Sequence, residues 1–468
     1  MSKLFKAPCS IHFVGIGGIG MSGIAEVLLT LGHRVSGSDI QETETTRRLV
    51  EHGASVSLGH SADAIGPDTD VVVISSAVNY SNPEIGRARE LNIPVIPRAE
   101  MLAELMRLKE GIAVAGTHGK TTTTSLIASI LSRAGRDPTA VIGGKVHSMG
   151  SAGRLGQGDL LVAEADESDG SFLLLTPAIA VVTNIDPEHL DYYGDMERVR
   201  GAFSDFVNRV PFYGMGVLCL DSVNVRALLP HVRKRFITYG TSAEADYEAR
   251  DVCVVGMDTV FEAARHGEGL GTVRLRLPGR HQALNALAAI AVATELEVPF
   301  EQIRAALAEF GGIHRRFELC GESGGVTVFS DYGHHPEEIR ATLAAAREGF
   351  GRRIVAVFQP HRYSRTRDLF NEFLECFDDA DHVFMTDIYA AGEEPLDGLS
   401  GEVLYWALKR RGHMDVSYVP RVEDLVAGMR PHLRPGDLVM VMGAGNIHRV
   451  AEELADHIVG SQGTWTVQ

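Results

Sequence analysis

Two glycine-rich segments each follow a short apolar run and precede a helical pattern, an arrangement that suits phosphate binding in α/β proteins. The first, Gly15-Ile16-Gly17-Gly18-Ile19-Gly20, satisfies G-x-G-x-x-G, and Asp39 ends the next expected strand, where a ribose-binding carboxylate would lie. Glycines let the backbone approach a diphosphate, and the following helix N-terminus stabilises its charge. By itself this segment is compatible with NAD(P), with another diphosphate, or with a tight strand-to-helix turn that binds nothing.

The second segment is Gly116-Thr117-His118-Gly119-Lys120-Thr121-Thr122, which contains the working part of a P-loop. In such a loop Lys120 would neutralise the β- and γ-phosphate oxygens, and the Thr121 hydroxyl would reach Mg²⁺. Val114 stands where the full P-loop pattern has a glycine. A helix capped by threonines is the alternative, but the strand–turn–helix context favours phosphate binding.

Two further segments place acids and a histidine after expected strands of the same sheet. Glu164-Ala165-Asp166-Glu167-Ser168-Asp169 offers carboxylates to a Mg²⁺ ion beside the P-loop, although Ser168 or Asp169 could instead cap a helix. Thr183-Asn184-Ile185-Asp186-Pro187-Glu188-His189 ends in a histidine. A single histidine in such a position is more often structural than a ligand. A ligand role for His189 is favoured here because its strand should neighbour the strand that precedes Lys120.

Charge and cysteine content indicate which ligands the chain could bind and which cellular compartment suits it. The formal net charge of −17 argues against non-specific nucleic-acid binding, while basic residues cluster at Arg315–Arg316 and His361–Arg367. Such clusters indicate a discrete anionic ligand or merely an ordinary charged surface. The five cysteines are scattered and form no C-x-x-C pair, which favours free thiols in a reducing compartment. Lys3 and Lys6 precede an apolar run from Ile11, but glycines interrupt it, so a first strand is expected rather than a signal peptide.

The elements that must position these residues form three α/β series. Strands are expected over 11–14, 34–37, 71–75 and 94–96, then over 112–115, 160–163 and 179–183, and in the last third over 354–358, 382–386 and 438–442. Helical periodicity covers 20–31, 100–109, 121–134 and 283–296, and the pattern between 216 and 277 alternates as in β-structure. No apolar stretch approaches the ~20 residues that span a bilayer. We therefore expect a cytoplasmic α/β protein without membrane insertion, with domains at 1–110, 111–313 and 314–468.

The chain resembles the Mur ligase family over nearly its whole length, and most closely the branch of that family that adds alanine. The alanine-adding branch is indicated by the first and the sixth to eighth of nine motifs. In order, the motifs are VGIGGIGMSG from Val14, GTHGKTTT from Gly116, EADESDGS from Glu164, NIDPEHLD from Asn184, GRHQALNALAA from Gly279, Arg315–Phe317, DYGHHP from Asp331, FQPHRYSRTR from Phe358 and GAGNIH from Gly443.

This resemblance implies a fold of three domains: an N-terminal Rossmann-like domain for a UDP-sugar, a central P-loop ATPase-type α/β domain, and a C-terminal Rossmann-like domain. It implies an ATP- and Mg²⁺-dependent amide ligase that adds L-alanine to the lactyl carboxylate of UDP-N-acetylmuramate through an acyl phosphate, in peptidoglycan precursor synthesis. The first glycine loop would then bind a UDP-sugar rather than NAD. The implied UDP-sugar residues are Gly15, Gly17, Gly18, Gly20, Met21, Asp39, Ser75 and Ser76.

The remaining implied residues surround ATP, magnesium and the reacting carboxylate. The ATP set comprises Gly116, Thr117, His118, Gly119, Lys120, Thr121, Thr122, His281, Asn285 and Arg316. The metal set comprises Thr121, Glu164 and His189. The catalytic set comprises Lys120, Glu164, His189, His334, His335, Arg362 and Arg365. His334, His335 and Asp331 are candidate bases for the alanine amine by position only, and His361, Arg362 and Arg365 would bind the acyl phosphate or the alanine carboxylate.

Two departures and three alternatives accompany the resemblance. Gln282 stands where the adenine motif is expected to hold asparagine, and Ser204 stands where several relatives carry a carbamylated lysine. The alanine-adding branch is expected to lack that lysine. The alternatives are a ligase of the same superfamily that attaches murein tripeptide to UDP-N-acetylmuramate, an NAD-dependent dehydrogenase and a non-catalytic P-loop regulator. The sequence leaves monomer and homodimer equally open.

Overall fold

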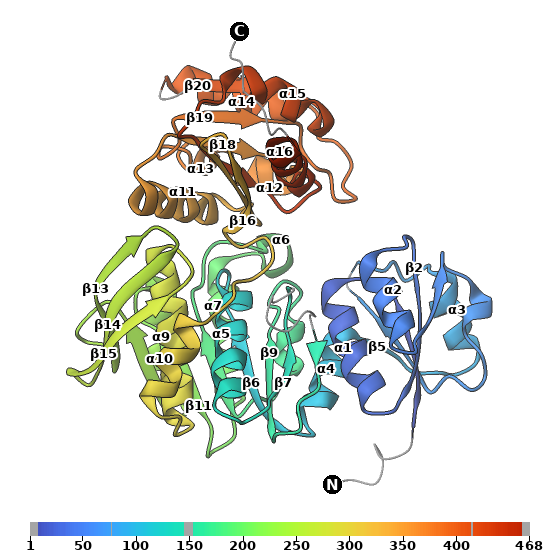
Figure 1. The fold of residues 1–468 in the computed structure, drawn as a ribbon. Helices are drawn as coiled ribbons and strands as arrows, with labels where there is room; N and C mark the ends of the chain where they lie inside the picture. Colours follow the sequence, from blue (N-terminus) through green and yellow to red (C-terminus); the bar gives the residue numbers. More distant parts are fainter. Residues whose placement is uncertain (1–7, 76, 145–152, 413–414, 461–468) are drawn as a thin grey trace. The chain divides into compact units, whose positions relative to one another are not determined.

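The computed structural model describes residues 8–75, 77–144, 153–412 and 415–460, and their strands form three sheets (Figure 1). The sheets contain five, ten and six strands and follow one another along the chain. This three-domain α/β architecture confirms the fold class expected from the sequence. Among the described residues, no helix is both long enough and apolar enough to cross a membrane.

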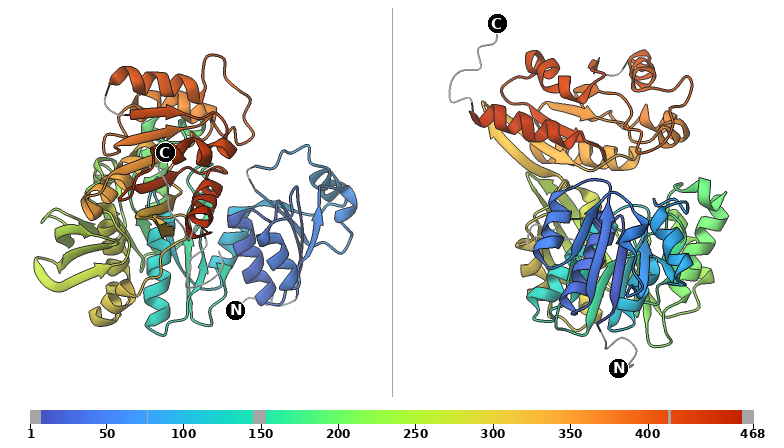
Figure 2. Two further views of the ribbon diagram at one scale, coloured as in Figure 1. Left: turned by 45° about the horizontal axis from the view of Figure 1, so that its top comes forward. Right: turned by 90° about the vertical axis from the view of Figure 1, so that its right-hand side faces the viewer.

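The N-terminal sheet is parallel and has the order β3-β2-β1-β4-β5. Side chains of β1 alternate between two apolar layers: Ile11 and Phe13 pack with α1 and α4, whereas Val14 packs with Ile85 of α3. Figure 2 shows these strands from two further directions, with helices on both faces. The elements are β1 (Ser10–Val14), α1 (Ile19–Thr30), β2 (Arg34–Asp39), α2 (Glu44–Glu51), β3 (Ser55–Leu58), β4 (Val71–Ile74), α3 (Pro83–Glu90), β5 (Val95–Pro97) and α4 (Arg98–Met106).

The strand order of this sheet reverses between β1 and β4. In parallel sheets ligands bind in the crevice at such a switch point, beyond the carboxyl ends of the strands. The loop after β1 begins with Gly15, and the loop after β4 begins with Ser75. A Cβ atom on Gly15 would lie 3.9 Å from the Ser75 hydroxyl, so the two loops lie side by side as the topology requires.

The central sheet has the order β15-β14-β13-β12-β11-β10-β6-β9-β7-β8. Strand β6 lies between β10 and β9 and is parallel to both, so the loops after these three strands share one edge. The elements are β6 (Glu110–Ala115), α5 (Lys120–Arg133), β7 (Thr139–Val141), β8 (Gly153–Arg154), β9 (Leu160–Glu164), β10 (Ile179–Val182), α6 (Leu190–Tyr193), α7 (Met196–Asn208), β11 (Met215–Cys219), α8 (Val223–Arg226), β12 (Phe236–Gly240), β13 (Tyr247–Val255), β14 (Asp258–Arg265), β15 (Glu268–Leu275), α9 (Arg280–Glu295) and α10 (Phe300–Ala308).

The C-terminal sheet has the order β16-β17-β21-β18-β19-β20 and is parallel except for β16. Strand β21 separates β17 from β18, which places the loops after these three strands next to one another. The elements are β16 (Glu318–Ser323), β17 (Val326–Asp331), α11 (Pro336–Phe350), β18 (Ile354–Phe358), α12 (Tyr363–Asp368), α13 (Phe370–Phe373), β19 (His382–Met385), α14 (Gly401–Arg411), β20 (Asp415–Tyr418), α15 (Leu425–Met429), β21 (Leu438–Met442) and α16 (His448–Gly460).

The chain divides into two compact units, and these do not coincide with the three expected domains. One unit comprises Met1–Asp251, Phe261–Arg274 and Leu284–Gly311, and thus holds the N-terminal sheet and most of the central one. The other comprises Val252–Val260, Leu275–Ala283 and Gly312–Gln468. The boundaries at 110 and 314 therefore remain predictions.

Candidate functional site: two glycine loops around one cavity

The loop after β1 is held to the neighbouring strand by its own backbone. Gly15 has φ +79°, a conformation that favours glycine, and the amides of Gly15 and Ile16 donate to the carbonyl of Ser38 at 2.8 and 3.0 Å. Gly18 is the N-cap of α1 and has no side chain to cap the helix. The first turn of α1 can therefore receive an anion, as helix N-termini do.

Asp39 supports this loop directly. The Gly17 amide donates to Asp39 Oδ2 at 2.9 Å, and a Cβ atom on residue 17 would lie 2.9 Å from both Asp39 Oδ2 and Thr46 Cγ2. Asp39 also lines a separate cavity of about 420 Å³ beside α2 and β3. The carboxylate thus holds the loop in place, and its contact with a ribose remains a prediction. Ser76, predicted for the same site, lies outside the described residues.

The loop after β6 has the backbone of a phosphate-binding turn. Gly116 and Gly119 have φ +135° and +81°, and a Cβ atom on Gly119 would collide with the Asn285 side chain. Helix α5 starts directly at Lys120. Asn285, predicted to contact adenine, therefore packs against the loop itself. His281, predicted with it, contacts the side chain of Gln282 at 2.9 Å.

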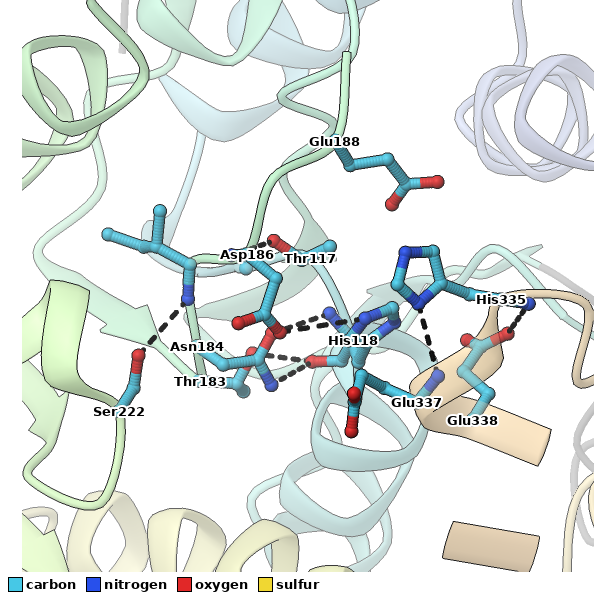
Figure 3. A network of polar contacts seen from close by, with 12 residues as sticks. Thr117, His118, Thr183, Asn184, Asp186, Glu188, Ser222, His335, Glu337 and Glu338 are labelled. Carbon is cyan, nitrogen blue, oxygen red and sulfur yellow. Dashed lines mark hydrogen bonds and ion pairs between the residues drawn. The ribbon is translucent and has the colours of Figure 1, made fainter. Parts of the chain in front are cut away.

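The loop after β10 locks this turn in place (Figure 3). The His118 amide donates to Asn184 Oδ1 at 2.7 Å, and the His118 carbonyl accepts from Thr183 Oγ1 at 2.6 Å and from Asn184 Nδ2 at 3.1 Å. Thr117 Oγ1 accepts from the Asp186 amide at 2.9 Å. Thr117 and His118, which are predicted to bind ATP, are thus held in place by the loop that follows the neighbouring strand β10.

Lys120 lies among carboxylates of the loop after β9. Its ammonium donates to Glu167 at 2.8 Å and to the Gly116 carbonyl at 2.5 Å, and Glu167 is only 4% exposed. Burial alone would lower the pKa of Lys120, but Glu167, Asp166 and Glu188 raise it overall. Lys120 is therefore a fixed cation at neutral pH.

The predicted metal residues Thr121, Glu164 and His189 lie at or after the ends of the neighbouring strands β6, β9 and β10. Glu164 accepts from the Gly143 amide at 2.6 Å, and His189, with φ +58°, lies 4.0 Å from Glu188. Among the described residues no group of three His, Cys, Asp or Glu side chains is arranged to hold a metal ion. The acidic loop still fits Mg²⁺, because this ion keeps several waters and takes one or two carboxylates plus substrate phosphates. Buried Glu167 Oε2, which has no hydrogen-bond partner, supplies such an oxygen.

One cavity of about 330 Å³ joins the two glycine loops. From the predicted UDP-sugar set it is lined by Gly15, Gly18, Gly20, Met21 and Ser75. From the predicted catalytic set it is lined by Lys120 and Glu164. Arg98 and Asp166 also line it, and the Arg98 guanidinium donates to Asp166 at 3.0 Å. The sequence analysis missed Arg98, which follows the expected strand over 94–96 but belongs to none of the glycine or acidic motifs.

The C-terminal sheet brings a second predicted group together. His334 and His361 have ring centroids 5.7 Å apart, and Arg365 Nη1 lies 3.2 Å from His361 Nδ1. Burial, reinforced by these basic neighbours, lowers the pKa of His361 to about 3, so the ring is neutral near pH 7. Arg362 has φ +71°, and its amide donates to the Tyr389 carbonyl at 2.8 Å.

Three other predicted residues of this sheet have structural contacts. His335 caps α11 by accepting from the Glu337 amide at 3.3 Å (Figure 3). Buried Asp331 accepts from the amides of Phe317 and Gly333 at 2.8 and 2.7 Å, and burial raises its pKa. Arg316 lies over the Tyr332 ring, 5.2 Å from its centroid. These contacts position the loop after β17, and roles in ATP binding or as a base remain predictions.

Comparison with known proteins settles the family. Residues 10–110 match the "Mur ligase family, catalytic domain", residues 114–293 the "Mur ligase middle domain", and residues 315–445 the "Mur ligase, glutamate ligase domain". The chain belongs to the Mur ligase family. The UDP-N-acetylmuramate–L-alanine ligase of Myxococcus xanthus is 58% identical over 456 residues, 97% of this chain and 96% of that protein. The protein of the same name from an Anaeromyxobacter species is 59% identical, over 97% and 99%.

Solved structures of the Mur ligase family agree with this result. The UDP-N-acetylmuramate–alanine ligase of Thermotoga maritima superimposes with a TM-score of 0.84 at 32% identity, over 97% of this chain and 100% of that one. The murein peptide ligase of Psychrobacter arcticus gives a TM-score of 0.70 at 25% identity, over the same shares of the two chains. The alanine-adding enzyme is the more similar of the two.

Proposed function

We propose that this chain is an ATP-dependent ligase that joins L-alanine to the lactyl carboxylate of UDP-N-acetylmuramate in peptidoglycan precursor synthesis. The observation that carries the proposal is the cavity shared by the first glycine loop and Lys120. A diphosphate on the loop of Gly15–Gly20 and an ATP on the loop of Gly116–Thr122 would meet there. Their reacting ends, a carboxylate and a γ-phosphate, would then be neighbours. The names of the relatives that are 58–59% identical supply the sugar and the amino acid.

The reaction needs activation because a carboxylate is a poor electrophile. The carboxylate oxygen takes the γ-phosphoryl group of ATP, ADP leaves, and an acyl phosphate forms. The free amine of alanine then attacks the carbonyl carbon, and the tetrahedral adduct collapses with loss of phosphate. Two anions approach each other in the first step, and the fixed positive charge of Lys120 offsets their repulsion.

Magnesium belongs to the same proposal. We assign it to Thr121, Glu164 and His189, and the loop after β9 also contains the carboxylates of Asp166 and Glu167. When bound, it would neutralise phosphate charge during transfer. The chain's own part would be to supply oxygen ligands beside Lys120 from the acidic loop after β9, since Mg²⁺ commonly takes only one or two carboxylates together with waters and substrate phosphates.

The C-terminal loops complete the assignment. Arg362 and Arg365 would bind the acyl phosphate or the alanine carboxylate, for which a guanidinium fork is suited. His334, His335 and Asp331 are the candidates for the base that takes the amine proton, and each of them also contacts the loop after β17. We assign UDP-sugar binding to residues 1–110, ATP to 111–313 and the amine to 314–468. We assign the enzyme to the reducing cytoplasm, where cysteines such as the five of this chain do not form disulfides.

A phosphate-release assay over a panel of amines tests the substrate. We expect turnover with ATP, UDP-N-acetylmuramate and L-alanine, and little with murein tripeptide. Robust activity with the tripeptide and none with L-alanine would instead favour the murein peptide ligase activity.

Replacement of the P-loop lysine tests the mechanism. Lys120→Ala should abolish turnover, by about 10³-fold or more, because the charge of Lys120 acts on the transferring phosphoryl group. Binding of UDP-N-acetylmuramate to Lys120→Ala, measured calorimetrically, should persist. Full turnover of this variant would refute the assignment.

A further inference from the structure

Arg98 lies at the active edge of the N-terminal sheet although no glycine motif includes it. It is the first residue of α4, directly after β5, and β5 pairs with β4 in parallel. Its guanidinium rests against the first turn of α1, since a Cβ atom on Gly20 would lie 3.1 Å from Arg98 Nη1. The Arg98 side chain is 22% exposed and lines the cavity between the two glycine loops.

The partner of Arg98 comes from the central sheet. Asp166 lies two residues beyond the end of β9, and its Oδ2 accepts from Arg98 Nη2 at 3.0 Å. Arg98 is thus the cation placed between the first turn of α1 and the acidic loop beside Lys120.

The charges that line the cavity can be matched to the charges of the proposed substrates. Two cations, Arg98 and Lys120, line it together with two carboxylates, Glu164 and Asp166. Lys120 serves the ATP phosphates, and the backbone amides and helix N-terminus of α1 serve the sugar diphosphate. The remaining anion is the lactyl carboxylate, and the remaining cation is Arg98. A guanidinium can bind a carboxylate with two parallel hydrogen bonds.

We propose that Arg98 binds the lactyl carboxylate of UDP-N-acetylmuramate and exchanges Asp166 for it when the sugar arrives. This inference rests on the proposed function. Arg98 thereby selects a UDP-sugar that carries a carboxylate and holds that carboxylate beside the γ-phosphate that Lys120 binds. Arg98 acts on substrate binding and orientation, because its pair with Asp166 holds the guanidinium at the cavity.

Two UDP-sugars that differ only in the lactyl group provide the test. UDP-N-acetylglucosamine has the same diphosphate, uridine and acetamido group as UDP-N-acetylmuramate but no carboxylate. Calorimetric titration of each sugar into Arg98→Gln should show about 10- to 100-fold weaker binding of UDP-N-acetylmuramate, the range expected for a lost charge-assisted contact. Binding of UDP-N-acetylglucosamine should change by less than about 3-fold. Arg98→Lys, which keeps the charge but not the fork, should fall between Arg98→Gln and the parent chain.

Two further variants separate ligand binding from structural support. Arg107→Gln removes an exposed arginine at the other end of α4 and should leave both affinities unchanged. Asp166→Asn frees Arg98 from its partner and should not weaken binding of UDP-N-acetylmuramate. Equal losses of affinity for the two sugars in Arg98→Gln would overturn the proposal, because Arg98 would then bind the diphosphate. Equal losses of affinity for UDP-N-acetylmuramate in Arg98→Gln and Asp166→Asn would also overturn it, because the pair would then only connect the two sheets. An unchanged affinity in Arg98→Gln would overturn it as well.

The same titrations distinguish this inference from the proposed function. If the parent chain neither binds UDP-N-acetylmuramate nor turns over L-alanine with ATP, the proposed function itself fails. If the parent chain does both and only the selective loss in Arg98→Gln is missing, the function stands and the role of Arg98 is refuted.

Discussion

A buried carboxylate behind the first glycine loop should control both the stability of the N-terminal sheet and its binding of the sugar. Glu84, in the first turn of α3, is fully buried. It accepts from Ser38 Oγ at 2.7 Å and from the Ser61 amide at 3.2 Å, and it pairs with His12 at 3.4 Å. Burial alone would raise the pKa of Glu84, but the contacts with His12 and Ser38 lower it overall. The carboxylate is therefore ionised in the folded chain.

The expected magnitudes follow from what each substitution leaves behind. Glu84→Ala leaves the Ser38 hydroxyl and the Ser61 amide without their buried acceptor and should lower the free energy of unfolding by about 2–5 kcal/mol. Glu84→Gln keeps the shape but loses the charge, and should cost about 1–3 kcal/mol. The Ser38 carbonyl also accepts from the amides of Gly15 and Ile16, so a shift of Ser38 would displace the diphosphate loop. Both variants should therefore bind UDP-N-acetylmuramate more weakly.

Hydrogen exchange during urea titration can localise this loss. Peptides that cover β1 and β4 should lose protection at a urea concentration about 1–3 M lower in Glu84→Ala. Both tryptophans, Trp406 and Trp465, lie beyond residue 400, so their fluorescence reports the other end of the chain and should not change. Glu90→Ala, at the exposed end of α3, is the matched control and should stay within about 0.5 kcal/mol of the parent. A change below about 0.5 kcal/mol in both Glu84 variants would refute the reasoning.

The pH dependence has a definite sign. Because the pKa of Glu84 is lower in the folded chain than its ordinary value of 4.5, its contribution to stability is fully present above about pH 4.5. It is lost as the pH falls below 4.5 toward the folded-state pKa. The parent chain should therefore lose more stability than Glu84→Gln over that interval.

Two other consequences of the structure can be tested separately. Gly119→Ala should reduce ATP affinity and turnover by about tenfold or more, because residue 119 has φ +81° and a Cβ atom there would collide with Asn285. The control Gly135→Ala, where φ is +74° but the space is open, should leave ATP affinity unchanged. Equal ATP affinities of Gly119→Ala and the parent would contradict this prediction. The pKa of His361 is lowered from 6.5 to about 3, so its contribution to stability is present above about pH 6.5 and is lost as the pH falls toward 3. NMR titration should show a neutral His361 ring from pH 8 down to pH 5. A titration midpoint near 6.5 would contradict the burial argument.

Much of the site could be predicted from local patterns, for a physical reason. In a parallel sheet every strand ends at the same edge, so a motif that directly follows an apolar strand can be placed without knowledge of the other strands. This is why Lys120 and Glu164 were expected near one another, whereas Ser75 was grouped with Gly15 and Gly18 through the resemblance to the Mur ligases. All five line the same cavity.

Contacts that depend on strand order or on unpatterned residues could not be predicted. Arg98 follows the expected strand over 94–96, but it belongs to no phosphate-binding motif, and the pairing of β5 with β4 is what shows that it reaches the cavity. The choice of Glu167 rather than Glu164 as the partner of Lys120 depends on the path of the loop after β9. Helices α2 and α3 have mostly polar sequences of eight residues each, and both were missing from the expected elements.

The ion pairs of the cavity also decide how the lysine experiment must be interpreted. Lys120 pairs with Glu167 and Arg98 pairs with Asp166, so one acidic loop neutralises both cations. This lowers the cost of burying the two cations until anionic substrates replace the carboxylates. Lys120→Ala therefore removes a catalytic charge and also leaves the buried carboxylate of Glu167 without its partner. The double variant Lys120→Met with Glu167→Gln removes both charges. It should recover stability relative to Lys120→Ala but no turnover, and recovered turnover would show that Lys120 acts only by supporting the fold.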